Sequence, residues 1–349
     1  MIRHLADIGQ LAGCPIISRL LLPLADIQHM DLPLRALSAF TIGPLYRLGE
    51  RSLLLKGSRL RHSIFQILEM ISRTTAGRAR DAFNRAPSQP AYLDGSQLDG
   101  FIARYYRDAK TRCDKRFPHE KADERAAEIV QTVRRARRGT PWVGRGACRF
   151  LDIACGDGLT ADALARLGAE VSAIDLTDKR FVGTCKFETM DAAAMRFADA
   201  SFDVAYTFDA FEHFSNPDVV MREAYRVLKP GGLLYASFGP LYNSPHGAHQ
   251  FLSIDVPYCH LLFREEDCNA AAENRGLRPL TKNLNYWSLR DFRKLFYRFT
   301  DRFETIYRLE KFNVSFIDLI RQFPTCFRSK VNNFDELIVR SIEVLLRKR

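Results

Sequence analysis

From Arg149 onward, short apolar runs alternate with stretches of helical periodicity. The apolar runs predict strands at Arg149–Ala154, Glu170–Leu176, Lys186–Met190, Phe202–Thr207 and Gly232–Phe238, with Phe303–Leu309 and Glu336–Leu346 as the last two. Helices are expected at about 159–167 and 218–228, and at Ser288–Arg298, which opens with the capping pattern Ser288-x-x-Asp291. Because strands that are separated by helices favour parallel pairing with crossover connections, the pattern predicts an α/β fold.

The preceding part of the chain has a different pattern. Residues 1–75 are rich in Leu and Ile and are interrupted by prolines, which predicts short helices; within them, Ser52–Arg73 reads as a basic amphipathic helix. Arg78–Ser96 reads as a linker, and residues 97–138 return to helical periodicity. We therefore expect a basic, mainly helical region at 1–145 and an α/β domain at 146–349, with an insertion at about 240–300.

Charge is divided unevenly between these two regions. Residues 1–145 contain 25 of the 52 Lys and Arg but only 14 of the 41 Asp and Glu, so the whole net charge of +11 lies there. Two interpretations remain open: the region contacts an anionic surface such as a membrane, or the charge is the solvated face of packed helices. No run of about 18 uncharged apolar residues is present, so no membrane-spanning helix is predicted.

Cysteine spacing indicates a cytoplasmic protein with reduced thiols. The eight cysteines include no C-x-x-C pair and no Cys/His spacing typical of zinc sites. We expect a cytoplasmic location, with peripheral contact at the inner face of the membrane as the further hypothesis for the basic region.

The strongest local signal is a buried strand that leads into a glycine-bearing turn and then a helix, at 150–158. Gly156 and Gly158 allow a ligand to approach the backbone closely, and the free N–H groups at a helix start favour an anionic group. Nineteen residues after Gly156, Asp175 ends the second predicted strand, where a carboxylate can accept from ribose hydroxyls. The glycine pattern alone also fits dinucleotide-binding dehydrogenases.

The order of motifs along 149–238 resembles the class I S-adenosylmethionine-dependent methyltransferases, in particular their small-molecule branch. The matching pieces are Leu-Asp-Ile-Ala-Cys-Gly-Asp-Gly at 151–158, Ile-Asp-Leu at 174–176, Met-Asp-Ala at 190–192, Ser-Phe-Asp-Val-Ala-Tyr at 201–206, Glu-His at 212–213 and Leu-Lys-Pro-Gly-Gly at 228–232. The resemblance implies a Rossmann-like seven-stranded sheet and S-adenosylmethionine as the cofactor.

The same resemblance implies which residues bind the cofactor. They are Asp152, Ala154, Gly156 and Gly158 at the methionine end, Asp175 and Leu176 at the ribose, Asp191 and Ala192 at the adenine, and Phe208 and Asp209 beneath the sulfonium. Only fifteen residues separate Asp175 from Asp191, fewer than the family usually needs for a crossover helix and a strand, so that helix should be short or irregular.

Three histidines are candidates for a general base, which is needed only for a hydroxyl or protonated amine acceptor. His213 follows the fourth strand, and His246 and His249 lie in the loop after the fifth, at the edge where α/β proteins bind ligands. No metal site is predicted, because no third ligand accompanies His246 and His249. Tyr242, Tyr258 and Trp287 are candidate walls of the acceptor pocket.

The sequence therefore predicts a methyltransferase that acts on a small-molecule, sugar or lipid-linked acceptor. A nicotinamide-dependent oxidoreductase and a non-catalytic adenosylmethionine-binding protein are the alternatives. Nucleic acid is disfavoured as a substrate, because no Asn-Pro-Pro-Tyr or Asp-Pro-Pro-Tyr element follows the fourth strand.

Overall fold

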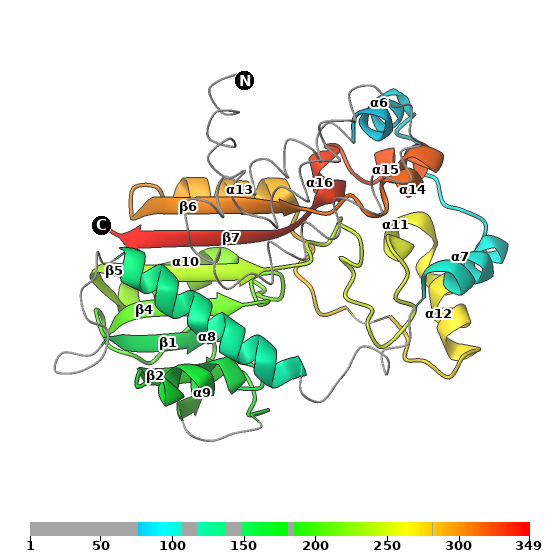
Figure 1. The fold of residues 1–349 in the computed structure, drawn as a ribbon. Coiled ribbons are helices and arrows are strands. Elements are labelled where there is room, and N and C mark those ends of the chain that lie inside the picture. Colours follow the sequence, from blue (N-terminus) through cyan, green and yellow to red (C-terminus); the bar gives the residue numbers. More distant parts are fainter. Residues whose placement is uncertain (1–75, 107–116, 137–147, 181–184, 281) are drawn as a thin grey trace, which may run out of the picture. The chain divides into compact units, whose positions relative to one another are not determined.

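A seven-stranded mixed sheet forms the centre of the fold (Figure 1). The computed structural model describes residues 76–106, 117–136, 148–180, 185–280 and 282–349. The strands run β3 (Lys186–Thr189), β2 (Glu170–Asp175), β1 (Arg149–Ile153), β4 (Phe202–Phe208), β5 (Leu228–Phe238), β7 (Val339–Lys348) and β6 (Phe303–Phe312) across the sheet. The first five are parallel, whereas β7 is antiparallel to both of its neighbours. This order reverses direction beside β1, and open α/β sheets bind ligands at such a point.

Helices cover both faces of the sheet. In Figure 1, α8 (Phe117–Ala136) and α9 (Leu159–Arg166) lie on one side, and α10 (Pro217–Val227) and α13 (Leu289–Arg298) lie on the other. Apolar residues of α8 form one buried cluster with β1 and α9: Ala122, Ala126, Ile129, Val130 and Val133 contribute from the helix. This packing explains the helical periodicity of α8, since a stripe of apolar side chains must be buried against another element.

The predicted capping of α13 is confirmed. The Ser288 hydroxyl accepts from the Asp291 N–H at 3.2 Å, and the Asp291 carboxylate accepts from the Ser288 N–H at 3.1 Å. Together these bonds satisfy two backbone donors that a helix start leaves without intrahelical partners.

One predicted element is wrong, and another begins later than predicted. The supposed linker Arg78–Ser96 contains helix α6 (Gly77–Arg85), which buries Ala79 and Phe83. The strand expected at Glu336–Leu346 begins only at Val339, because α16 (Asp335–Ile338) forms a helical turn before it. In α6 the tertiary packing of Ala79 and Phe83 outweighs the polar local composition.

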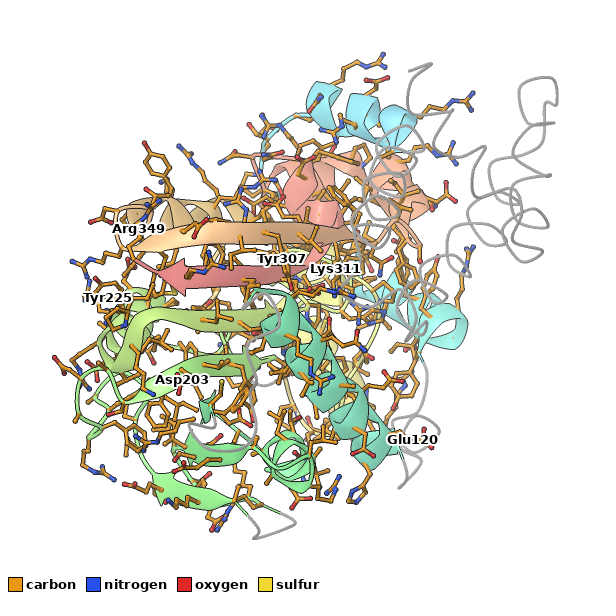
Figure 2. All side chains as sticks on the ribbon, turned by 60° about the vertical axis from the view of Figure 1, so that its left-hand side comes forward. Glu120, Asp203, Tyr225, Tyr307, Lys311 and Arg349 are labelled. Atoms are coloured by element: carbon orange, nitrogen blue, oxygen red, sulfur yellow. The ribbon has the colours of Figure 1, made fainter. Side chains whose placement is uncertain are left out.

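The C-terminal half adds several short helices. They are α11 (Cys259–Leu262), α12 (Glu265–Glu273), α14 (Ile317–Gln322) and α15 (Pro324–Arg328); earlier in the chain come α7 (Leu98–Tyr105) and the 3-10 turn η3 (Gly95–Gln97). Tyr307 and Lys311 of β6, labelled in Figure 2, both contact the carboxylate of Glu343 on β7, at 2.9 and 3.0 Å. Among the described residues, none of the helices combines the length and apolarity that crossing a membrane requires.

The short helices predicted in residues 1–75, with the amphipathic helix at Ser52–Arg73 among them, lie outside the described residues.

Candidate functional site

The turn after β1 places several backbone groups at the carboxyl edge of the sheet. Ala154, Gly156 and Gly158 all have positive φ, at 59°, 57° and 73°. A Cβ added to Gly156 would meet nothing within 4 Å, so open space adjoins this backbone. The Cys155 N–H donates to the Ile174 carbonyl at 3.0 Å and thereby ties the turn to β2.

Asp175 joins the glycine turn to the end of β2. Its Oδ2 accepts from the Gly156 N–H at 3.0 Å, and its backbone carbonyl accepts from the Met190 N–H at 2.9 Å. The three strand ends β1, β2 and β3 are thus connected through one residue. Beside it Leu176 is 68% exposed, so its apolar side chain is open to the edge where a ligand would lie.

Asp191 and Ala192 follow β3 at this same edge. The Asp191 side chain is exposed and accepts from the Ala193 N–H at 2.8 Å, whereas Ala192 is buried. No helix occurs between β2 and β3 in the described part of 176–185, in line with the short spacing.

Asp152 is a buried carboxyl directly below the glycine turn. It is 3% exposed and pairs in register with Tyr206 of β4. Burial raises the pKa of Asp152 to about 7, because the charged form loses hydration that the site only partly replaces. A carboxyl in this state gains from a nearby cation, such as an ammonium group on a bound ligand.

Two cationic residues of α8 complete the site, and the sequence did not identify them. Lys121 Nζ lies 3.4 Å from Asp209 Oδ2, Arg125 forms an ion pair with the same carboxylate, and the Arg125 guanidinium lies 4.4 Å from the centre of the Phe208 ring. Although burial acts to raise it, these two cations lower the pKa of Asp209. The only signal in the sequence was the i, i+4 spacing of Lys121 and Arg125 on a predicted helix.

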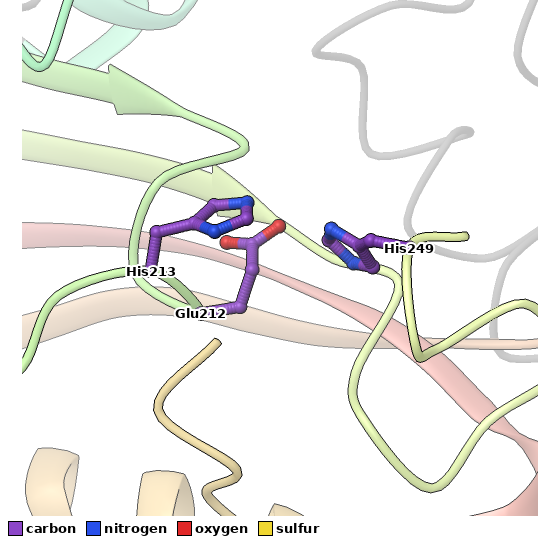
Figure 3. A group of neighbouring side chains, drawn as sticks. All are labelled: Glu212, His213 and His249. Carbon is purple, nitrogen blue, oxygen red and sulfur yellow. The ribbon is translucent and has the colours of Figure 1, made fainter. Parts of the chain in front are cut away.

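The three candidate histidines have three different surroundings. His246 Nδ1 lies 2.6 Å from Oδ1 of the buried Asp255, His249 Nε2 lies 2.8 Å from the Pro240 carbonyl oxygen, and His213 Nδ1 lies 2.7 Å from the Asn283 carbonyl oxygen. Burial lowers the pKa of His249. His249 and His213 come together with Glu212 (Figure 3). His246 instead contacts the carboxylate of Asp255.

Residues 151–236 match the protein family described as "Methyltransferase domain". A ubiquinone biosynthesis O-methyltransferase of Xanthomonas oryzae pv. oryzae is 36% identical over 100 residues, which are 26% of this chain and 42% of the relative. A ubiquinone biosynthesis O-methyltransferase of Parvibaculum lavamentivorans is 28% identical over 120 residues, which are 32% of this chain and 46% of that relative. The chain thus spans less than half the length of these curated relatives. Residues 151–236 are therefore a methyltransferase domain of the class I, S-adenosylmethionine-dependent kind.

Solved structures similar to the chain include an S-adenosylmethionine-dependent methyltransferase from Methanosarcina mazei. It is 21% identical, with a TM-score of 0.36, over 58% of this chain and 92% of that one. Another, described as a possible histamine N-methyltransferase, comes from Thermotoga maritima. It is 16% identical, with a TM-score of 0.38, and the match covers 67% of this chain and 93% of that one.

S-adenosylmethionine is the cofactor of this methyltransferase domain, and the residues at the edge of the sheet fit it. Open space beside Gly156, the Asp175 carboxylate and the exposed Leu176 surround the region where a nucleoside would lie. Asp152 and Arg125 provide opposite charges for an amino acid group.

The three aromatic residues predicted to line the acceptor pocket lie in different surroundings. Tyr242 lines a cavity of about 430 Å³ together with Gln250, His260 and Tyr286. Tyr258 is instead fully buried, and its hydroxyl donates to the Leu337 carbonyl at 2.8 Å. The Trp287 ring packs against Phe292 at 5.4 Å and stays outside the lining of this cavity.

Proposed function

We propose that the protein transfers the methyl group of S-adenosylmethionine to a hydroxyl oxygen of a small-molecule or lipid-linked acceptor. The observation that carries this proposal is the junction of the Gly156 turn with Asp175 at the carboxyl edge of β1 and β2. The names of the two relatives, which are O-methyltransferases of ubiquinone biosynthesis, favour an oxygen acceptor.

In this proposal, different residues bind different parts of the cofactor. Asp175 accepts from the ribose hydroxyls, Asp191 and Ala192 adjoin the adenine, and Leu176 packs against the ring system. Ala154, Gly156 and Gly158 let the methionine part approach the backbone. Asp152 pairs with its ammonium group and Arg125 with its carboxylate, while Phe208 and Asp209 lie beneath the sulfonium.

When bound, the cofactor supplies a methyl carbon activated by a positively charged sulfur. The residues of the chain align the acceptor with that carbon and exclude water. With the cofactor held by these residues, an oxygen lone pair of the acceptor would form the new C–O bond, and the sulfur would leave with the electron pair of the C–S bond.

We assign the acceptor proton to His246, because a carboxylate orients its imidazole. The buried Asp255 accepts the Nδ1–H, which leaves the Nε2 lone pair as the base and stabilises the imidazolium that forms. A carboxylate that orients an imidazole in this way is a recurring arrangement in proton-transfer sites. The contact favours His246 over His213 and His249, whose observed partners are backbone carbonyls.

Titration calorimetry of the full chain tests the proposed cofactor. S-adenosylmethionine and its demethylated product should both bind, and NAD should not; NAD binding would favour the oxidoreductase. Gly156→Val should abolish binding, because the new side chain fills the open space beside the turn and strains its positive φ. Retained affinity in this variant would contradict the assignment.

A screen of phenolic, sugar and lipid-linked hydroxyl compounds then tests turnover. Formation of S-adenosylhomocysteine together with a product 14 Da heavier, about the mass of one CH₂, is expected for at least one class. Cofactor binding without turnover in every class would favour the non-catalytic alternative.

We also propose two features outside this site. The basic region 1–145 contacts an anionic membrane surface, and the catalytic domain is the part after residue 146, with α8 as the element of the basic region that packs on its sheet.

A further inference from the structure

Glu212 carries a buried carboxylate oxygen that has no hydrogen-bond partner. The residue is 3% exposed; its Oε1 accepts from the Gly239 N–H at 2.9 Å, but Oε2 is buried without a partner. Burial raises the pKa of Glu212 to about 8, since the charge lacks hydration there. An unpaired buried carboxylate costs several kcal/mol unless it gains a proton or a cation.

Two imidazoles face this carboxylate. In Figure 3 the side chains of His213 and His249 approach Glu212 from opposite sides. One ligand atom from each of the three side chains lies within 4.8 Å of the other two. The residues come from two segments far apart in the sequence, the turn after β4 and the loop after β5.

Backbone carbonyls determine which nitrogen of each ring is protonated. A carbonyl can only accept, so His213 donates from Nδ1 to Asn283 and His249 donates from Nε2 to Pro240. In the neutral rings this leaves lone pairs on Nε2 of His213 and Nδ1 of His249. Metal-binding histidines almost always have their second nitrogen fixed in this manner.

We propose that Glu212, His213 and His249 bind a divalent first-row transition metal ion such as Zn²⁺. Two imidazoles and one carboxylate are the ligand set of open zinc and iron sites, which keep further coordination positions for water or substrate. Ligand bonds of about 2.0–2.2 Å require the three side chains to close in slightly around the ion. His213 is exposed, so the remaining positions are accessible from solvent.

The location suggests a use for the ion, and this part of the inference rests on the proposed function. The pair Glu212–His213 follows Asp209 closely in the chain, beside the predicted sulfonium position. An acceptor hydroxyl that occupies an open coordination position would have a lowered pKa, so it would reach the methyl carbon as a better nucleophile.

Cobalt titration of the full chain, stripped of metal with a chelator, tests the site. We expect one Co²⁺ per chain, visible absorption bands typical of nitrogen and oxygen ligands, and displacement by Zn²⁺. Glu212→Gln and His249→Asn should each weaken binding about tenfold or more. His246→Asn is the matched control, because His246 lies in the same loop and also has positive φ, yet contacts Asp255; it should bind cobalt like the wild type.

Absence of the absorption bands in the wild type, or unchanged affinity in Glu212→Gln, would overturn the proposal. Glutamine retains an oxygen that can accept from the Gly239 N–H, so Glu212→Gln keeps this contact of the fold. It therefore tests the metal site even if His249→Asn fails to fold. Addition of catechol as a hydroxyl probe should shift the cobalt bands. Unchanged bands would contradict binding of the acceptor hydroxyl to the ion, but not the metal site itself. Adenosylmethionine binding, measured on the metal-free protein, tests the proposed function separately.

Discussion

Asp175 would have two tasks in the proposed function, because the carboxylate that accepts from the Gly156 N–H is also the proposed acceptor for the ribose hydroxyls. Asp175→Ala should weaken S-adenosylmethionine binding by about 1–3 kcal/mol, since two ribose hydroxyls lose a charged acceptor. Calorimetry measures this directly. Asp175→Asn is the control for the turn, because its amide oxygen can still accept from Gly156; equal affinity of Asp175→Ala and the wild type would place the ribose elsewhere.

Asp152 makes the stability of the protein depend on pH. Its pKa rises from 3.8 to about 7 on folding, so between these values the folded state holds a proton that the unfolded state has lost. The contribution of Asp152 therefore decreases as pH rises through this window, by at most about 4 kcal/mol. Urea unfolding at pH 5 and pH 8 should show a larger loss for the wild type than for Asp152→Asn, whose amide does not titrate. Parallel losses would show that burial does not perturb this group.

At the residue scale, the sequence predicted individual positions better than it predicted partners. Spacing and resemblance pointed to Gly156 and Asp175, which the structure joins by a hydrogen bond. They could not reveal that Arg125 pairs with Asp209 or that His249 meets Glu212, since these pairs lie 84 and 37 positions apart and depend on how α8 and the loop after β5 pack.

At the element scale, the loop 240–262 is the part assigned to the acceptor. His246→Ala should lower turnover about 10²–10⁴-fold, the usual contribution of a general base, while S-adenosylmethionine affinity stays nearly unchanged. Asp255→Asn should reduce turnover less, because Nε2 remains in place although its tautomer is no longer fixed. Steady-state kinetics and calorimetry on the same preparations measure both effects. A parallel loss of cofactor affinity would indicate that the loop covers the cofactor.

The strands with strong apolar patterns were predicted nearly to the residue, for example β2 and β4. Elements that are stabilised by residues far away in the sequence were not predicted. Helix α6 buries Phe83 against Phe334, at ring centroids 5.7 Å apart, and Arg80 bonds to Asp335 at 2.8 Å. No local pattern contains this information, because both partners come from the region before β7.

At the scale of the whole molecule, the excess positive charge of residues 1–145 is proposed to contact membranes. Binding of the full chain to vesicles containing phosphatidylserine should be measurable at low salt and should decline as salt is raised, since screening shortens the reach of each Lys and Arg. Deleting residues 1–75 should remove the binding and leave S-adenosylmethionine affinity intact. Vesicle binding that persists in a folded truncated protein would assign the contact to another surface.

The position of β7 also bears on the order in which the chain can fold during synthesis. β7 is the last of the seven described strands to be made, yet it lies between β5 and β6, and within the described part of the chain it is the one strand paired with β6. While the ribosome is still adding residues before Val339, β5 keeps an unpaired edge, and such edges promote aggregation. Pairing along this edge of β5 is therefore postponed until translation has passed β7.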